Sequence, residues 1–263
     1  MAEPAPGPSI DSTVPHSARI WNYWLGGKDN FAVDRKAGDA YAATFPDIIT
    51  IARESRKFLV RAVHYLAAEA GVRQFLDIGT GLPVMQNTHE VAQRAAPDAR
   101  IVYVDNDPLV LTHARALLTN TTDEGVTGYI DADFHNPDQI VADAKNILNF
   151  TQPIAVMFMG VLGHVTDFDE TRSIVGRVMA AVPSGSYLVL YDGTDNEAAS
   201  EALDDYKDTG AVPYVNRSSQ QLARLFEGLE MLEPGLVPIT QWRPDPAAEA
   251  PAVDAYGGVG RKP

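Results

Sequence analysis

Between residues 74 and 191, short apolar runs alternate with longer segments in which apolar residues recur every three or four positions. Short apolar runs are typical of buried strands, and the longer pattern is typical of helices that pack on one face. The predicted strands are 74–78, 100–104, 127–130, 154–159 and 186–191. The predicted helices between them are 84–96, 108–118, 136–148 and 167–182. This alternation predicts an α/β protein with a doubly wound, mostly parallel sheet and right-handed crossovers.

The flanking segments have other patterns and suggest how the chain is divided. Residues 1–14 are rich in Pro, Ala and Ser and are predicted to be a disordered tail. Residues 15–72 are predicted to form a helical extension, and residues 73–263 the main domain. In the extension, Ser17 is expected to cap a short helix, and longer helices are expected over 34–44 and 50–70. The core positions expected on the longest helix are Ile51, Phe58, Val63, Leu66 and Ala67.

After the fifth predicted strand the spacing of the elements changes. Helices are predicted over 196–207 and 218–226, the second capped by Ser218. Extended segments are predicted over about 231–242 and 256–261, and an Ala/Pro-rich mobile loop over 246–251. Because the first extended segment contains Pro234 and Pro238 and is followed closely by Pro244, it fits an edge strand or a bent strand better than a central one.

The first predicted strand runs into a turn that contains two glycines, in the sequence Asp77-Ile78-Gly79-Thr80-Gly81. A strand, a glycine turn and a helix N-terminus together form the usual ligand-binding corner of an open α/β sheet. Glycine suits this corner because its backbone bends freely and no side chain blocks a ligand. We therefore expect the functional site here.

Three acids lie at or just after the ends of three successive predicted strands: Asp77, Asp105 and Asp133, spaced by 105 − 77 = 28 and 133 − 105 = 28 residues. Ligands of doubly wound sheets bind at the carboxyl ends of the strands. Asp105 can accept hydrogen bonds from a ribose diol, and Asp133 with Phe134 can offer a carboxylate and a ring to a base. The three acids and the glycine turn predict adenosine recognition, although each acid alone could be a helix cap or a turn residue.

The residues after the glycine turn distinguish between adenosine cofactors. The dinucleotide fingerprint needs a glycine or alanine where Val84 stands, and Pro83 removes one N–H from a pyrophosphate site. No Gly-Lys-Ser/Thr sequence follows the turn, so a Walker phosphate loop is missing. The sequence therefore favours a nucleoside cofactor without phosphate over NAD or ATP.

Composition and charge limit the classes of partner. The chain has 263 residues, 45% of them hydrophobic, and a net charge of −14, so a broad surface for nucleic acid is not expected. It has no cysteine, which fits a reducing cytoplasm. The N-terminal sequence does not resemble a signal peptide, and no apolar run reaches membrane-spanning length.

Two segments of the extension allow more than one interpretation. The aromatic sequence before Gly26-Gly27 is either a helix that ends at these glycines and packs on the core, or a lid over the ligand corner. The basic cluster Arg53, Arg56, Lys57 and Arg61 is either a solvated helix face or a source of one partner for a ligand carboxylate. We favour the solvated face for this cluster.

The turn Asp77-Ile78-Gly79-Thr80-Gly81 resembles the first motif of class I S-adenosylmethionine-dependent methyltransferases. The segments 19–31 (RIWNYWLGGKDNF) and 256–262 (YGGVGRK) resemble more specifically an actinobacterial S-adenosyl methyltransferase family of largely unassigned substrate. This resemblance implies a Rossmann-like methyltransferase fold with seven strands, whose last pair is an antiparallel hairpin, and S-adenosylmethionine as the cofactor. The resemblance covers nearly the whole chain from His16. The chain differs from many class I enzymes at Leu82-Pro83, where those enzymes have further small residues.

The resemblance also implies roles for residues. Gly79 and Gly81 would approach the methionine part of the cofactor, and Asp77 its amine. Asp105 would hold the ribose, and Asp133 and Phe134 the adenine. The further cofactor-binding candidates are Thr80, Asn106, Gly160, Tyr23, Gly26, Gly27 and Asn30.

Methyl transfer needs a general base only when the acceptor must lose a proton. His164, just after the fourth predicted strand, is the candidate catalytic residue, although we favour the interpretation of a loop histidine bonded to backbone. No Asn-Pro-Pro-Tyr or Asp-Pro-Pro-Tyr sequence follows this strand, which lowers the expectation of a DNA substrate. Candidates for an acceptor pocket are Tyr23, Lys28, Asn30, Tyr191, Tyr206 and Tyr214.

We therefore expect a cytoplasmic methyltransferase that acts on a small molecule, with no nucleic-acid or membrane partner and a homodimer left open. One alternative is a non-catalytic protein that senses S-adenosylmethionine. The other is an NAD-dependent oxidoreductase, whose sheet would lack the terminal antiparallel hairpin.

Overall fold

The computed structural model describes residues 10–84, 86–117, 119–247 and 250–263. Most of the predicted tail, residues 1–14, lies outside these ranges, as do two residues of the predicted loop 246–251. Within the described part of the chain, no helix is long and apolar enough to cross a membrane.

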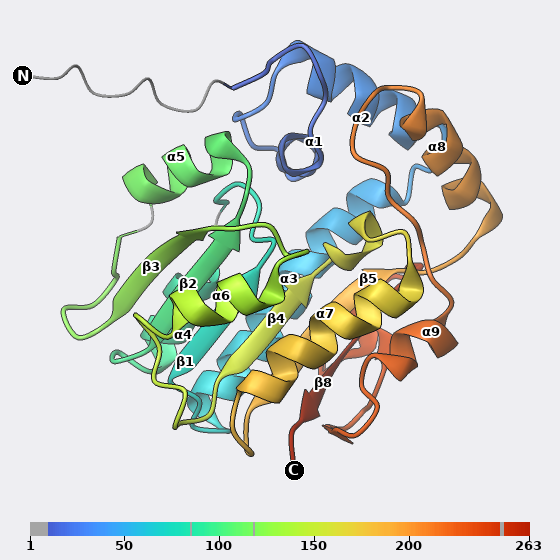
Figure 1. Cartoon of the computed structure of the whole chain (residues 1–263). Coiled ribbons are helices and arrows are strands. Elements are labelled where there is room, and N and C mark those ends of the chain that lie inside the picture. The colour runs from blue at the N-terminus through green and yellow to red at the C-terminus, as the bar shows by residue number, and fades with distance from the viewer. Residues whose placement is uncertain (1–9, 85, 118, 248–249) are drawn as a thin grey trace, which may run out of the picture.

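A single mixed sheet forms the centre of the molecule (Figure 1). Its strands are β1 (Gln74–Ile78), β2 (Arg100–Asp105), β3 (Val126–Asp131), β4 (Ala155–Met159), β5 (Tyr187–Gly193), β6 (Glu230–Met231), β7 (Val237–Pro238) and β8 (Ala255–Arg261). The strand order is β3-β2-β1-β4-β5-β8-β6, and β7 also pairs with β8. The first five strands are parallel, as the alternating pattern predicts.

Helices cover both faces of the sheet, so its central strands are buried throughout (Figure 1). On one face lie α3 (Ile48–Ala68), α4 (Thr88–Ala95) and α5 (Pro108–Leu117). On the other lie α6 (Pro137–Ala144), α7 (Phe168–Ala181) and α9 (Ser219–Arg224). The five core positions expected on the longest helix are all buried on α3. This helix lies within the main core, so the division of the chain at residues 72/73 stays a prediction.

Three further helices lie beyond the carboxyl ends of the parallel strands (Figure 1). They are α1 (Ser17–Trp24), α2 (Ala32–Thr44) and α8 (Glu197–Lys207), and α2 packs against both α1 and α8. We call these three helices the cap. The cap brings together two segments that lie more than 150 residues apart in the sequence.

Local capping explains where the helices differ from prediction. His16, not Ser17, is the N-cap of α1, because its imidazole accepts a hydrogen bond from the backbone N–H of Ala18 at 3.3 Å. Helix α4 begins at Thr88 rather than at Val84. Gln86 has a φ of 61°, which a helix cannot contain, and Asn87 forms a capping box with Glu90.

The predicted terminal hairpin is present, but its first strand is divided. The chain forms two short strands, β6 and β7, in place of one, and a 3₁₀-helix, η2 (Ile239–Gln241), follows them. Pro234 and Gly235 lie between the short strands, and Pro238 ends the second. Proline lacks the N–H that a continuous ladder needs, which explains the break. Strand β8 runs antiparallel to β5 over seven residue pairs and closes the sheet as expected.

Candidate active site

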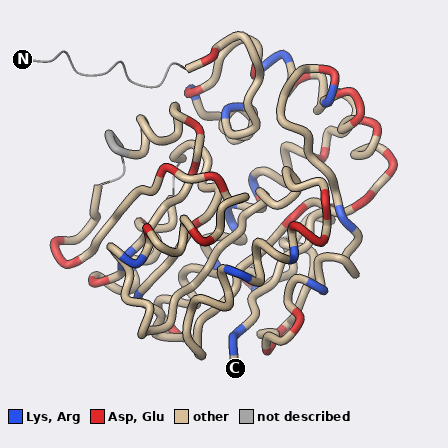
Figure 2. Tube along the Cα trace, viewed as in Figure 1, with Lys and Arg blue, Asp and Glu red and all other residues tan. Residues whose placement is uncertain are grey.

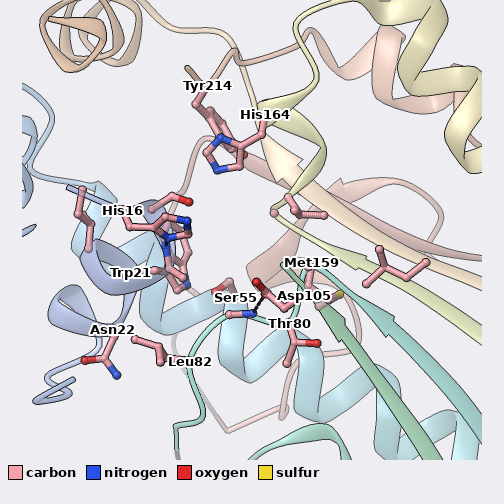
Figure 3. A pocket seen from close by; sticks show the side chains of 18 of the residues that line it. His16, Trp21, Asn22, Ser55, Thr80, Leu82, Asp105, Met159, His164 and Tyr214 are labelled. Atoms are coloured by element: carbon pink, nitrogen blue, oxygen red, sulfur yellow. Dashed lines mark hydrogen bonds between the residues drawn. The ribbon is translucent and has the colours of Figure 1, made fainter. Parts of the chain in front are cut away.

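A cavity of about 350 Å³ lies between the carboxyl ends of the parallel strands and the cap (Figure 3). Most of the predicted site residues line it: Asp77, Gly79, Thr80, Gly81, Asp105, Asn106, Asp133, Phe134, Gly160 and His164. Four candidates from the N-terminal segment do not line it: Tyr23, Gly26, Gly27 and Asn30. The fold thus brings three strand ends, the glycine turn and the loop after β4 to one space.

The two glycines of the first turn have different surroundings. Both have a positive φ, 73° at Gly79 and 68° at Gly81, a conformation that favours glycine. A Cβ on Gly79 would meet the side chain of Val161 at 2.3 Å, whereas a Cβ on Gly81 would meet nothing within 4 Å. Gly79 therefore allows close packing, and Gly81 leaves bare backbone facing the open cavity.

Asp77 is a buried acid at the end of β1. It is only 3% exposed, and its Oδ2 accepts a hydrogen bond from the Thr88 hydroxyl at 2.7 Å. Burial raises the pKa of Asp77 to about 6, while the Thr88 hydrogen bond and the nearby Arg56 guanidinium act in the opposite direction. A carboxylate in this state would be stabilised by a cationic group of a ligand.

Arg56 of α3 fits the less favoured interpretation of the basic cluster, in which one member faces the ligand site. It lines the cavity beside Asp77, and its guanidinium donates to the Gln86 carbonyl at 2.8 Å. Arg53 and Lys57 are exposed, as expected for a solvated face, so that interpretation is confirmed for them and wrong for Arg56. Helical spacing could have indicated that Arg56 points inward, because it shares a helix face with buried Ala52 and Leu59.

Arg61, the fourth member of the basic cluster, also departs from the solvated face. Its guanidinium donates to the carbonyls of Trp242 at 2.8 Å and Ile239 at 2.5 Å. It therefore ties α3 to the terminal segment and has no place in the cavity.

Asp105 connects the end of β2 to the glycine turn. One carboxylate oxygen accepts from the backbone N–H of Gly81 at 2.8 Å, and the other from the backbone N–H of Asp107 at 2.9 Å. Burial raises the pKa of Asp105, and these two hydrogen bonds oppose the shift. Each oxygen keeps acceptor capacity for a ligand hydroxyl, because a carboxylate has about four lone-pair positions.

Asp133 and Phe134 follow β3 and line the same cavity. Asp133 accepts a hydrogen bond from the backbone N–H of His135 at 2.9 Å, so it is a turn residue as well as a lining residue. Phe134 packs at the margin of the core beneath α6 and α7, and its ring lies 4.7 Å from the ring of His135. Asp133 is therefore a turn residue that also lines the cavity, and its contact with an adenine stays a prediction.

Side-chain contacts with Asp34 and Asp107 hold the N-terminal helix α1 over the cavity. His16 Nδ1 lies 3.0 Å from Asp107 Oδ2, and Arg19 lies 3.7 Å from Asp34 and 3.9 Å from Asp107. The residues of this segment that line the cavity are His16, Ser17, Ala18, Ile20, Trp21, Asn22, Trp24 and Leu25. The helix ends at Trp24 with Leu25 as its C-cap, and Gly26 follows with a φ of 80°. The segment is therefore both a capped helix and a cover for the cavity.

The four N-terminal candidates outside the cavity make contacts within the cap. Tyr23 donates its hydroxyl to Asp39 at 2.7 Å, and Asn30 donates to Asn22 and to the Gly27 carbonyl, each at 3.0 Å. A side chain at Gly27 would overlap Asn22, which lines the cavity. Because these four residues do not line the cavity, a role for them in cofactor binding stays a prediction.

His164 lies in the short 3₁₀-helix η1 (Leu162–His164) after β4 and points into the cavity (Figure 3). Its Nδ1 is 2.9 Å from the carbonyl oxygen of Pro213. Because a carbonyl only accepts, Nδ1 carries the proton and Nε2 has the free lone pair in the neutral ring. Burial lowers the pKa of His164, which favours this neutral form.

Loop residues 213–217 hold the segment around His164 on both sides. Val215 donates its N–H to the Gly163 carbonyl at 2.8 Å, and Arg217 donates to the carbonyls of Leu162 at 3.0 Å and of Val165. The ring of Tyr214 lies edge-on to His164 at 4.9 Å. Its hydroxyl donates to buried Asp192, whose pKa burial raises to about 6. These contacts fix the position of the imidazole.

The acceptor-pocket candidates are also divided by the structure. Tyr191, Tyr206 and Tyr214 line the cavity, and Lys28, like Tyr23 and Asn30, does not. Aromatic residues of the cap that the sequence analysis did not select, Trp21 and Tyr41, line it as well.

The sheet order and the cavity define the class of protein. One antiparallel strand lies between β5 and β6, and a bare glycine turn meets acids at three neighbouring strand ends. This is the Rossmann-like fold and cofactor corner of class I S-adenosylmethionine-dependent methyltransferases. The antiparallel strand is the feature that an NAD-dependent oxidoreductase was expected to lack, so that alternative finds no support.

Comparison with known proteins gives the family. The family model described as S-adenosyl methyltransferase matches residues 3–263, so the chain belongs to this family. The crystal structure of a DUF574 family protein from Streptomyces avermitilis has a TM-score of 0.91 at 41% identity, covering 97% of this chain and 100% of that one. A putative methyltransferase from Thermobifida fusca has a TM-score of 0.89 at 38% identity, with 98% of both chains covered.

More distant structures agree in fold. An O-methyltransferase family protein from Burkholderia thailandensis has a TM-score of 0.53 at 16% identity, covering 77% of this chain and 55% of that one. No functionally curated protein matches the chain. The protein is an S-adenosylmethionine-dependent methyltransferase, and S-adenosylmethionine is its cofactor. The alternative of a non-catalytic sensor finds no support in these comparisons.

Proposed function

We propose that this methyltransferase acts on a small-molecule acceptor, which it binds together with the cofactor in the cavity under the cap. The single observation that carries the proposal is that one cavity joins the strand-end acids to the aromatic side chains of the cap. A covered cavity suits a small acceptor better than a macromolecule. The net charge of −14 is a further argument against nucleic acid. The lack of cysteine supports a cytoplasmic location.

In the proposed arrangement, the methionine part of the cofactor lies at the first glycine turn. Asp77 pairs with the amine, the bare backbone of Gly81 lies against the ligand, and Arg56 pairs with the carboxylate. Two observations support this fit. Asp77 is an acid whose charged form is disfavoured by burial, and a Cβ on Gly81 would project into open space.

The nucleoside part extends along the neighbouring strand ends. Asp105 and Asn106 hold the ribose hydroxyls, and Asp133 and Phe134 contact the adenine. Thr80 supports the turn by donating its hydroxyl to the Asp77 carbonyl at 3.0 Å, and Gly160 forms the floor after β4. All these residues line the one cavity.

When bound, the cofactor supplies a methyl group on a sulfonium that is already activated. The protein's main task is then to place the acceptor and keep water out. His164, held with Nε2 unprotonated, accepts a proton from the acceptor where the acceptor has one to lose.

Calorimetry with S-adenosylmethionine, S-adenosylhomocysteine and NAD tests the proposal. We expect both sulfur nucleosides to bind and NAD to give no heat above dilution. A crystal soaked with S-adenosylhomocysteine should show the nucleoside beside Gly81 and Asp105. Binding of NAD in their place, or a nucleoside elsewhere on the molecule, would contradict the assignment.

A further inference from the structure

The outer part of the cavity is lined by aromatic and aliphatic side chains of the cap and by Tyr214 of the loop 213–217. We call this part the cap chamber and define it by Trp21, Trp24, Tyr41, Leu203, Tyr206 and Tyr214. A chain of ring contacts joins its walls: Trp21 to Trp24 at 5.6 Å, Trp24 to Tyr41 at 5.4 Å, and Tyr41 to Tyr206 at 6.2 Å. At these spacings the rings pack on one another and form a continuous aromatic wall, against which a flat ring can stack or pack edge-on.

The charges around the cap chamber are unfavourable for an anion. Among the described lining residues, the one lysine or arginine is Arg56, and it lies beside Asp77 at the cofactor end. Asp254 lines the cavity, and buried Asp192 lies behind Tyr214, where Arg217 is 3.9 Å away and offsets its charge. Helix α8, which supplies Leu203 and Tyr206, carries exposed acids along its outer side (Figure 2). A carboxylate or phosphate on the acceptor would meet repulsion here and no counter-charge.

His164 supplies the proton acceptor where the cap chamber meets the strand ends. Its Nδ1 is committed to the Pro213 carbonyl, so Nε2 is the ring atom left for a ligand. The groups that face the ring are Tyr214 at its edge and His16 across the cavity (Figure 3). Neither group carries a negative charge that would stabilise the protonated form of His164. The Tyr214 hydroxyl donates its hydrogen bond to Asp192 instead.

We infer that the cap chamber binds a neutral aromatic compound that carries a hydroxyl group, and that His164 Nε2 takes the hydroxyl proton during methylation. A lone pair of the hydroxyl oxygen forms the bond to the methyl carbon while the proton moves to Nε2 and the O–H electron pair stays on oxygen. The sulfur keeps the electron pair of the broken S–CH₃ bond. The products are the methyl ether, S-adenosylhomocysteine and a protonated His164 that returns its proton to water. This inference rests on the proposed function, because it places an acceptor beside the proposed cofactor site.

A matched set of probes tests the acceptor class: 4-nitrophenol, 4-nitroaniline and 4-nitrobenzoate, which share one ring and differ in one group. Binding to the protein saturated with S-adenosylhomocysteine is measured by calorimetry at a pH where the phenol is neutral and the benzoate is ionised. We expect the phenol to bind at least about tenfold more tightly than the benzoate. Trp21→Ala should weaken phenol binding while S-adenosylhomocysteine binding is kept, which also shows that the variant is folded.

The outcomes distinguish a failure of the acceptor assignment from a failure of the proposed cofactor site. If S-adenosylhomocysteine binds but the benzoate equals or exceeds the phenol, or no probe binds, the inference is wrong and the proposed function stands. If the aniline binds best, the hydroxyl assignment is wrong. If S-adenosylhomocysteine itself does not bind, the proposed cofactor site fails, and the inference fails with it.

The absorbance of 4-nitrophenol tests the role of His164 without turnover, because the phenol and the phenolate have different spectra. In the complex with S-adenosylhomocysteine, we expect the phenolate band to appear at lower pH than for the free compound. Nε2 accepts the proton, and the protonated His164 beside the phenolate then supplies the counter-charge that the chamber otherwise lacks. His164→Gln keeps a side chain of similar length but removes the base, so the shift should disappear. An unshifted band in the unmodified protein, or an equal shift in the variant, would overturn the role of His164.

Discussion

The carboxylate of Asp105 accepts a hydrogen bond from the backbone N–H of Gly81 at 2.8 Å, joining the end of β2 to the turn after β1. The acid proposed to hold the ribose therefore also fixes the turn proposed to hold the methionine. The two halves of the cofactor site depend on one side chain. A substitution of Asp105 should therefore disturb the glycine turn as well as the contact with the ribose.

Asp105→Ala should weaken binding of both S-adenosylmethionine and S-adenosylhomocysteine by about 1–3 kcal/mol, because ligand hydroxyls and the Gly81 N–H lose their acceptor. Calorimetry measures the affinity. Urea unfolding of the ligand-free protein measures how much stability is lost because the Gly81 N–H has no acceptor. Asp131→Ala is the matched control. Asp131 pairs with Asp105 in the sheet register but is exposed and does not line the main cavity. Unchanged affinity in Asp105→Ala would remove the ribose assignment.

Arg56→Met should weaken S-adenosylmethionine binding by roughly 10- to 100-fold, the usual cost of losing a charged hydrogen bond to a carboxylate. Methylthioadenosine has no amino-acid part, so its affinity should stay the same in this variant. Arg53→Met, on the exposed side of the same helix, should alter neither ligand. Equal losses for both ligands would show that Arg56 supports the turn rather than the carboxylate.

Binding of the cofactor should release protons near pH 6. Burial raises the pKa of Asp77 to about 6, so the free protein is about half protonated at this position at that pH. The cofactor amine favours the carboxylate and lowers its pKa, so affinity should rise with pH through 6 and level off above it. Calorimetry in buffers of different ionisation enthalpy should detect release of about half a proton near pH 6 and almost none near pH 8.

Asp77→Asn should abolish this proton release, since it keeps the acceptor for Thr88 but has no proton to lose. Asp192 also has a pKa of about 6, but it lies behind Tyr214 and is not expected to respond to the cofactor. Proton uptake on binding, or release that survives in Asp77→Asn, would contradict the pairing of Asp77 with the amine.

Gly163→Ala should destabilise the protein by about 1–3 kcal/mol and disturb the surroundings of His164. A Cβ at this position would lie 2.2 Å from the Tyr214 ring, so the ring must move and its hydrogen bond to Asp192 is strained. Chemical denaturation measures the loss. Gly176→Ala is the control, because a Cβ there meets nothing within 4 Å and the site is within α7. It should be neutral or stabilising.

Features that depend on neighbouring residues in the chain could be predicted from the sequence. The five parallel strands, the helices between them and the acids at their ends follow from apolar periodicity and from residues that stop a strand or begin a helix. The glycine turn follows in the same way, because Gly79 and Gly81 have the positive φ for which glycine is suited. Helix ends were less predictable where a capping side chain starts the helix later than the apolar periodicity suggests, as Asn87 does for α4.

Tertiary structure decided which residues share the cavity. Arg56 and Lys57 are adjacent in a basic cluster, yet only Arg56 lines the site, because the rotation of α3 against the sheet is set by packing across the whole core. The pairing of α2 with α8, which closes the cap chamber, joins segments whose contact no local pattern encodes. The orientation of His164 likewise comes from Pro213, 49 residues later. The sequence determined the strands and their terminal acids through local preferences, whereas long-range packing determined the walls of the site.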